Sequence, residues 1–165
     1  MKKETKIILA IFIGLAAIVA VLGYVNRNNI IARQELLADG YSFLVTHGAI
    51  THAIHISELI NLGAVPVTAS PRGEDRHFTG VLIRDILNYL SFDYATSRSI
   101  AFTSHDGFNS AIDIDELSHA FVVFEEDGER LASRDEGGPG LFMIVMAEDP
   151  FPNRWARYLL EITVQ

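Results

Sequence analysis

One stretch near the N-terminus constrains the fold of this chain more than any other feature. The run from Ile7 to Val25 contains no charged residue. As a helix it spans roughly 28 Å, which is close to the hydrocarbon thickness of a bilayer. The lysines that precede it, Lys2, Lys3 and Lys6, favour a cytoplasmic N-terminus. The sequence therefore predicts a single-pass protein of the cell membrane whose C-terminal domain is extracytoplasmic.

A cleaved signal peptide is the competing interpretation of the same run. Signal peptides usually have an apolar region of about 7–15 residues that is followed by a small-x-small cleavage site. The run is longer here, and the next residues, 23–28, contain no clean A-x-A pattern. An uncleaved signal anchor is therefore favoured, and a lipoprotein signal is excluded because the chain is cysteine-free.

Length and charge constrain the part of the chain beyond the anchor. The 165 residues leave room for one domain, and we divide the chain into a cytoplasmic tip with its transmembrane anchor (1–26), a stalk or linker (27–48) and an extracytoplasmic domain (49–165). The formal net charge of the whole chain is −8, and the part after the anchor is more acidic still. Such a domain attracts nucleic acid weakly, so no nucleic-acid partner is expected.

The rest of the chain alternates short strands with single helices, which predicts an α+β fold with a mixed or antiparallel sheet. Helices are expected after three N-cap residues, Ser57, Thr79 and Asp115. Pro66 places its strand at an edge or at a strand start. Strands are expected over 41–45, 49–56, 64–69, 100–104 and 110–114, in a hairpin about Asp127-Gly128, over 140–147 as a central strand, and over 158–164.

Several segments in a fixed order resemble the C-terminal part of the molybdopterin-binding domain of the sulfite-oxidase family. The resemblance covers residues 56–164 and implies a sulfite-oxidase-like fold with an oxidoreductase ancestry. The segments are FTGVLIRDIL from Phe78, IAFTSHDGFNSAIDIDEL from Ile100, FEEDGERL from Phe124, EGGPGLFMIV from Glu136 and RWARYLLEITV from Arg154.

The chain departs from that family at the positions that carry its chemistry. Catalytic members hold molybdenum through a cysteine thiolate, and this chain has none. Where the family resembles H-G-x-P-x-R, Glu136 occupies the His position and Leu141 the Arg position. We therefore expect no catalytic residue, no metal ligand and no resident cofactor. Molybdopterin remains the cofactor that the resemblance implies for the alternative below.

The resemblance places any surviving ligand site where three segments converge: the DG turn (105–109), the GGP turn (137–140) and the segment 154–157. Arg157 aligns with a basic family position and is expected to contact a phosphate, although a solvated surface role is the competing interpretation. The residues expected to bind are Arg157, Arg154, His105, Asp106, Gly107, Gly138 and Pro139.

Two other constellations suggest chemistry less strongly. Imidazoles bind Zn and Cu, but His52 and His55 would point to opposite faces of a strand, which argues against a metal site with His47. Ser104, His105 and Asp106 are adjacent in sequence, whereas the members of a catalytic triad converge from separate segments.

The leading hypothesis is a membrane-anchored binding or accessory module. Its ligand would be a small anion, a pterin-like molecule or a protein partner in the cell envelope. The alternative is a molybdopterin-dependent oxidoreductase whose cofactor site lacks cysteine or is shared with a partner subunit. A purely structural envelope protein is the third interpretation.

Overall fold

The computed structural model describes residues 3–165, with side chains described from residue 11 onward except at Asn28 and Asn29. The chain divides into two units, residues 1–38 and residues 39–165. The first unit holds the helix α1 (Lys3–Leu36). Its Ile11–Leu36 part has a mean hydropathy of 1.6 and is long and apolar enough to cross a membrane, by length and composition. Lys2 and the side chains of Lys3 and Lys6, on which the predicted orientation depends, lie outside the described residues.

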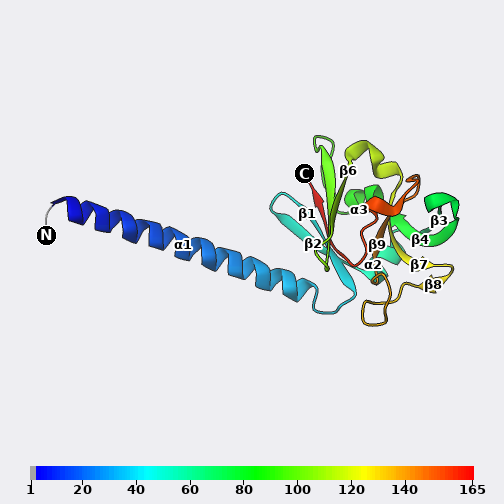
Figure 1. The fold of residues 1–165 in the computed structure, drawn as a ribbon, viewed down its shortest axis with the longest axis horizontal. Helices are drawn as coiled ribbons and strands as arrows, with labels where there is room; N and C mark the ends of the chain where they lie inside the picture. The colour runs from blue at the N-terminus through cyan, green and yellow to red at the C-terminus, as the bar shows by residue number, and fades with distance from the viewer. Residues whose placement is uncertain (1–2) are drawn as a thin grey trace. The chain divides into compact units, whose positions relative to one another are not determined.

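The second unit contains two five-stranded sheets. Figure 1 shows its strands together with the helices α2 (Ile56–Asn61) and α3 (Ile83–Tyr89). The first, sheet A, is mixed, because β1 and β10 run parallel while the other neighbours are antiparallel. Its order is β2 (Ile50–His55), β1 (Ser42–His47), β10 (Leu159–Val164), β5 (Ser99–Ser104) and β6 (Asn109–Asp113).

The second sheet, sheet B, is antiparallel throughout. Its edge strand β3 carries Pro66, which confirms the predicted edge position, since proline has no N–H to donate to a second neighbour. The predicted central strand is the fully buried β9, but among the described strands β9 pairs with β7 alone. The strands are β3 (Val65–Ala69), β4 (Arg76–Leu82), β7 (Ala120–Glu126), β8 (Glu129–Arg130) and β9 (Met143–Met146).

The mixed and antiparallel sheets confirm the predicted α+β class, and three predicted turns are present. Strands β1 and β2 meet around Gly48, β5 and β6 around Asp106-Gly107, and β7 and β8 around Asp127-Gly128. The stalk predicted over 27–48 differs from the structure, because residues 42–47 form β1 inside sheet A.

The helix starts differ from the sequence predictions. Helix α2 (Ile56–Asn61) is capped by His55, whose Nδ1 accepts from the Ser57 N–H at 3.1 Å, so Ser57 is not the cap. The short 3-10 helix η2 (Ile114–Ser118) is capped by Asp113 rather than Asp115, in a capping box with Glu116.

The predicted helix after Thr79 begins later than expected. Thr79 to Leu82 belong to β4, where they pair with β7, and α3 runs over Ile83–Tyr89. Gly80 explains the preference for a strand. A Cβ on this residue would lie 2.6 Å from the carbonyl oxygen of Val122, so the two backbones can approach closely only with glycine here.

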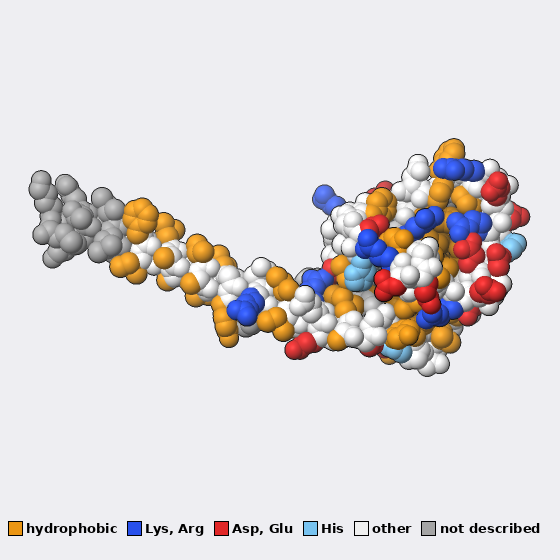
Figure 2. Space-filling model, turned by 60° about the horizontal axis from the view of Figure 1, so that its bottom comes forward, with side chains coloured by type: hydrophobic (Ala, Val, Ile, Leu, Met, Phe, Trp, Pro, Cys, Tyr) orange, Lys and Arg blue, Asp and Glu red, His pale blue; other side chains and the backbone are white. Residues whose placement is uncertain are grey.

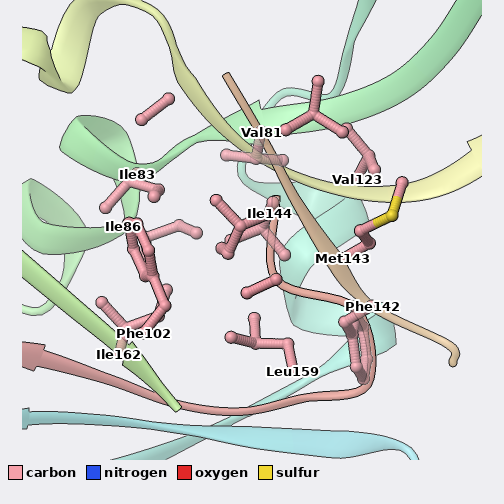
Figure 3. Packing of buried hydrophobic residues seen from close by; sticks show 14 of the residues in the cluster. Val81, Ile83, Ile86, Phe102, Val123, Phe142, Met143, Ile144, Leu159 and Ile162 are labelled. Atoms are coloured by element: carbon pink, nitrogen blue, oxygen red, sulfur yellow. The ribbon is translucent and has the colours of Figure 1, made fainter. Parts of the chain in front are cut away.

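A single hydrophobic core fills the space between these elements. Figure 3 shows side chains from β4, α3, β5, β7, β9 and β10 converging on one interior, among them Val81, Ile86, Phe102 and Ile144. Figure 2 shows acidic and basic side chains interspersed over the visible face of this unit. Two further 3-10 turns, η1 (Pro71–Gly73) and η3 (Pro152–Arg154), lie in the connections. The core thus fixes the strand ends from which the candidate site is built.

Candidate functional site

The DG turn and the GGP turn are joined through the backbone of Tyr158. The His105 N–H donates to the Tyr158 carbonyl oxygen at 2.9 Å, and the Tyr158 N–H donates to the Pro139 carbonyl oxygen at 2.7 Å. Tyr158 therefore stands between the two turns, directly before β10. Tyr158 lies one residue beyond the predicted segment 154–157.

Tyr158 is held in an uncommon conformation. Its φ is +52°, in the left-handed region that non-glycine residues rarely adopt. Gly140 lies against it with a φ of +93°, and a Cβ on Gly140 would come within 2.8 Å of the Tyr158 Cα. Backbone strain of this kind costs roughly 1–3 kcal/mol and is concentrated at functional sites. Because Gly140 has no Cβ, the backbone of Tyr158 can adopt this strained conformation beside it.

A cavity of about 270 Å³ opens beside this junction. Its apolar floor contains the buried side chains of Phe142 and Leu159, which Figure 3 shows in the core. The polar groups at its walls come from separate segments of the chain. The full lining is Gly40, Ser42, His105, Ser133, Arg134, Gly140, Leu141, Phe142, Tyr158 and Leu159.

Arg134 supplies a positive charge to this cavity. Its guanidinium carbon lies 5.6 Å from the centroid of the Tyr158 ring, a cation–π arrangement. Among the side chains that the structure describes, no carboxylate forms an ion pair with Arg134. The guanidinium is therefore positioned by an aromatic face and keeps its hydrogen-bond donors for another partner.

The loop that carries Arg134 is ordered by Glu136. The Glu136 carboxylate accepts from the Ser133 N–H at 2.7 Å, and the Gly137 N–H donates to the Arg134 carbonyl oxygen at 2.9 Å. The hydrogen bonds from Ser133 lower the pKa of Glu136, with a smaller contribution from Arg130. The Glu136 carboxylate is thus engaged in building the turn.

His105 lies on the same cavity, at the end of β5. Partial burial lowers the pKa of its imidazole, and repulsion from Arg134 lowers that pKa further, while Asp106 opposes the shift. The net shift favours the neutral form of the ring. The adjoining Ser104 is 2% exposed, and its hydroxyl has no hydrogen-bond partner among the described residues. The tripeptide 104–106 therefore shows no triad-like contact.

Arg154, predicted as a ligand-binding cation, is committed elsewhere. Its guanidinium donates twice to Asp149, at 2.9 and 2.5 Å, and lies 2.8 Å from Glu116. These partners, the Asp149 carboxylate first, raise the arginine's pKa above its ordinary value. We call this arrangement the η2–η3 clasp, because it links the two 3-10 helices. Its two carboxylates already neutralise the charge that a ligand would need.

Arg157 lies outside the cavity. It is exposed and lines a separate hollow of about 220 Å³ with Asp106, Phe108 and Trp155. Asp106 accepts from the Phe108 N–H at 3.0 Å and so builds its own turn. Of the seven predicted residues, His105 lines the cavity, and Pro139 borders it through its hydrogen bond to Tyr158. Gly107 has a φ of +87° within the DG turn, and Gly138 packs against Ala132.

The histidine cluster is divided between two structural roles. The ring centroids of His47 and His52 lie 5.4 and 5.7 Å, respectively, from the centroid of the Phe92 ring. His55 instead caps α2. Among the described residues, no group of three or more His, Cys, Asp or Glu side chains is arranged to hold a metal ion.

Sequence reasoning missed Arg134. It is the one basic residue between Leu131 and Phe142, in the loop that leads into the GGP turn. Its isolation in a loop is a signal in the sequence, whereas the family resemblance pointed to the segment that carries Arg154 and Arg157. Only the packing of Tyr158 between the two turns shows which arginine faces the cavity.

No model of a protein family matches this chain, and no curated protein matches it. An apolar floor with one guanidinium, one neutral imidazole and serine hydroxyls at its walls is suited to binding an anion.

Proposed function

We propose that this protein is a membrane-anchored extracytoplasmic binding module whose cavity takes a small organic anion. The observation that supports this most is Arg134, which is positioned over Tyr158 at an apolar-floored cavity without a carboxylate partner among the described side chains. Helix α1 supplies the anchor, and residues 39–165 form the module.

The size and lining of the cavity restrict the ligand. An apolar protein cavity of about 150 Å³ is large enough to hold benzene, and this cavity measures about 270 Å³. A ring-sized apolar body would lie against Phe142 and Leu159, and a carboxylate would face Arg134. A fork of guanidinium donors matches the two oxygens of a carboxylate. Benzoate is therefore a suitable first probe.

Because the module is acidic, only groups in direct contact with a bound anion can attract it. The chain is acidic overall, with a formal net charge of −8, so its long-range field repels anions. Attraction must then come from groups in direct contact with the ligand. A hydrogen bond to a charged group contributes about 1.5–3 kcal/mol, which corresponds to roughly ten- to a hundredfold in affinity.

The residues do not fit a cysteine-held molybdenum centre. The chain has no thiolate, and Leu141, at the position of the family's arginine, lines the cavity wall. A sulfite-oxidase-like ancestry is compatible with a cavity at this junction, and we include it in the proposal as the origin of the module. No oxidation step follows from the residues present.

Calorimetric titration of the detergent-solubilised full chain with benzoate tests the proposal. Arg134→Ala should weaken binding roughly ten- to a hundredfold, because the charge-assisted hydrogen bonds are lost. Arg157→Ala is the matched control: it removes an exposed arginine outside the cavity and should bind benzoate as the unmodified protein does.

Three results would overturn the proposal. Benzoate could fail to bind, or Arg134→Ala could bind it as tightly as Arg157→Ala does. Mass spectrometry could also find about one molybdenum per chain in protein from a molybdenum-proficient host, which would instead support the oxidoreductase.

A further inference from the structure

His105 and Arg134 approach the same cavity from different segments. His105 directly follows β5, and its backbone N–H donates to the Tyr158 carbonyl oxygen, which places the residue at the cavity wall. Arg134 comes from the loop between β8 and β9 and rests on the Tyr158 ring. An anion in the cavity would therefore lie within reach of two groups that can carry positive charge.

Besides Arg134, the polar and titratable groups near His105 come from the DG turn, from the residue before β10 and from β1. Tyr158 lies before β10, and Asp106 comes next in the DG turn. On the β1 side Ser42 lines the cavity, and its hydroxyl donates to Asp39 at 3.0 Å. Among the described side chains, Asp106 is the acidic neighbour that raises the imidazole pKa, and burial together with Arg134 outweighs it.

Without a ligand this surrounding disfavours a second positive charge. Burial removes water from part of the ring, and Arg134 repels a protonated imidazole, so the pKa of His105 lies below its ordinary value of 6.5. A bound anion would offset the repulsion from Arg134, because its negative charge neutralises the guanidinium. The same negative charge would also attract a proton to the imidazole. The imidazolium would also gain a hydrogen-bond acceptor.

We propose that anion binding in this cavity is coupled to the uptake of one proton by His105, so that the module binds its ligand more tightly in acidic surroundings. The inference rests on the proposed function and adds a regulation to the same site. The proton comes from solvent and is released again when the anion leaves. His105 is therefore a residue that both contacts the ligand and senses pH.

The sign of the effect follows from linkage. Protonation favours the anion, so the anion must favour protonation by the same factor, and the pKa of His105 rises on binding. Each unit of difference between the free and the bound pKa is a tenfold change in affinity between the alkaline and the acidic limits. For two charges in direct contact at a partly exposed site, we expect about a tenfold effect.

The experiment titrates the detergent-solubilised full chain with benzoate between pH 5.5 and pH 8, a range in which the probe stays ionised. Calorimetry gives the affinity, and nuclear magnetic resonance of ring-labelled histidines follows the protonation of His105, assigned with His105→Asn. We expect tighter binding by about tenfold at pH 5.5 and a rise in the His105 pKa when benzoate is added.

Variants separate His105 from the other five histidines. His105→Gln and His105→Asn should bind benzoate with little dependence on pH and with unchanged thermal midpoints, since the side chain is exposed on its outer side. His77→Gln is the control. This exposed residue on β4 contacts Thr68 and lies outside the cavity, so the variant should keep the pH dependence of the unmodified protein.

The outcomes distinguish the two proposals. If benzoate binds equally at both pH values and Arg134→Ala still weakens it, the proton coupling is wrong while the binding function stands. If the pH dependence persists in both His105 variants, the coupling is likewise wrong, because another group carries the proton. If benzoate binds at neither pH, both proposals are overturned.

Discussion

At the scale of single residues, the cavity depends on backbone conformations that few side chains permit. Tyr158 occupies the left-handed region, and its Cα can do so next to β10 because Gly140 has no Cβ. The strain is balanced by hydrogen bonds on both sides of the Tyr158 backbone, from His105 and to Pro139. This arrangement orients the aromatic ring on which Arg134 rests.

Gly140→Ala should therefore destabilise the module and weaken benzoate binding together. The new methyl group would come within 2.8 Å of the Tyr158 Cα, and the φ of +93° is itself unfavourable for alanine. We expect a loss of about 2–4 kcal/mol in the free energy of unfolding, measured by urea denaturation.

Gly63→Ala is the matched control for that change. Gly63 has a similar φ of +96°, but nothing lies within 4 Å of its Cβ position. It should lose only the conformational part, about 1 kcal/mol, and should bind benzoate normally. Equal losses in the two variants would show that contact with Tyr158 contributes nothing.

The candidate site was predictable only in part, because the sequence does not show which arginine faces the cavity. The family resemblance implied that the DG and GGP segments lie together, and both are hydrogen-bonded to the backbone of Tyr158. Which cation serves the cavity depends on side-chain directions, and these are set by non-local packing. Arg154 turns toward Asp149, whereas Arg134, which was not among the predicted residues, turns over Tyr158.

At the scale of elements, the η2–η3 clasp holds the connection after β9 against the connection after β6. Arg154 is the shared partner of Glu116 and Asp149, whose side chains are 33% and 15% exposed. Glu116 also closes the capping box of η2 by accepting from the Asp113 N–H at 2.9 Å. One guanidinium thus supports two 3-10 helices.

Arg154→Met should destabilise the fold because it leaves two carboxylates close together without their cation. Breaking a fully buried pair costs about 3–5 kcal/mol, and the partial exposure of this one reduces the expected loss to about 1–3 kcal/mol. Thermal unfolding measures it. Adding Asp149→Asn should recover part of the loss. If Arg154→Met melts with the unmodified protein, the clasp contributes no stability.

The strand pattern was largely predictable, and the helix starts were not. Alternating apolar residues and Asp-Gly turns identify the hairpins because those signals are local. The local sequence after Thr79 fits a helix as well as a strand. The residues up to Leu82 form a strand because they pair with β7. Likewise His55 replaces Ser57 as a cap because β2 delivers its imidazole to the helix start.

At the scale of the whole molecule, α1 and the module make separate contributions. The helix supplies a length and composition suited to a bilayer, and the module supplies the cavity. An anchored module would act on ligands that reach the membrane surface. Its side of the membrane is then a central property of the protein.

We expect the C-terminus to lie outside the cytoplasm and the full-length chain to remain with membranes after carbonate extraction. The lysines before Ile7 motivate the orientation, and the uncharged run motivates the retention. C-terminal reporter fusions that are active on one side of the membrane measure it. Activity of a cytoplasm-specific reporter would contradict the orientation, and release of a shortened soluble form would indicate signal cleavage.

The parallel pairing of β1 with β10 has a consequence for how the protein is made. Thr46 and Glu161, which share a 2.6 Å hydrogen bond across these strands, are 115 residues apart in the chain. Contacts of such high sequence separation form slowly, because a long loop must close first. Until β10 has been synthesised, β1 and β5 each lack their shared neighbour in sheet A. Their unpaired edges can then form hydrogen bonds with other chains. The whole span from Ser42 to Val164 therefore has to be synthesised before sheet A can close, because β10 is the last strand of the chain and the central one of the sheet.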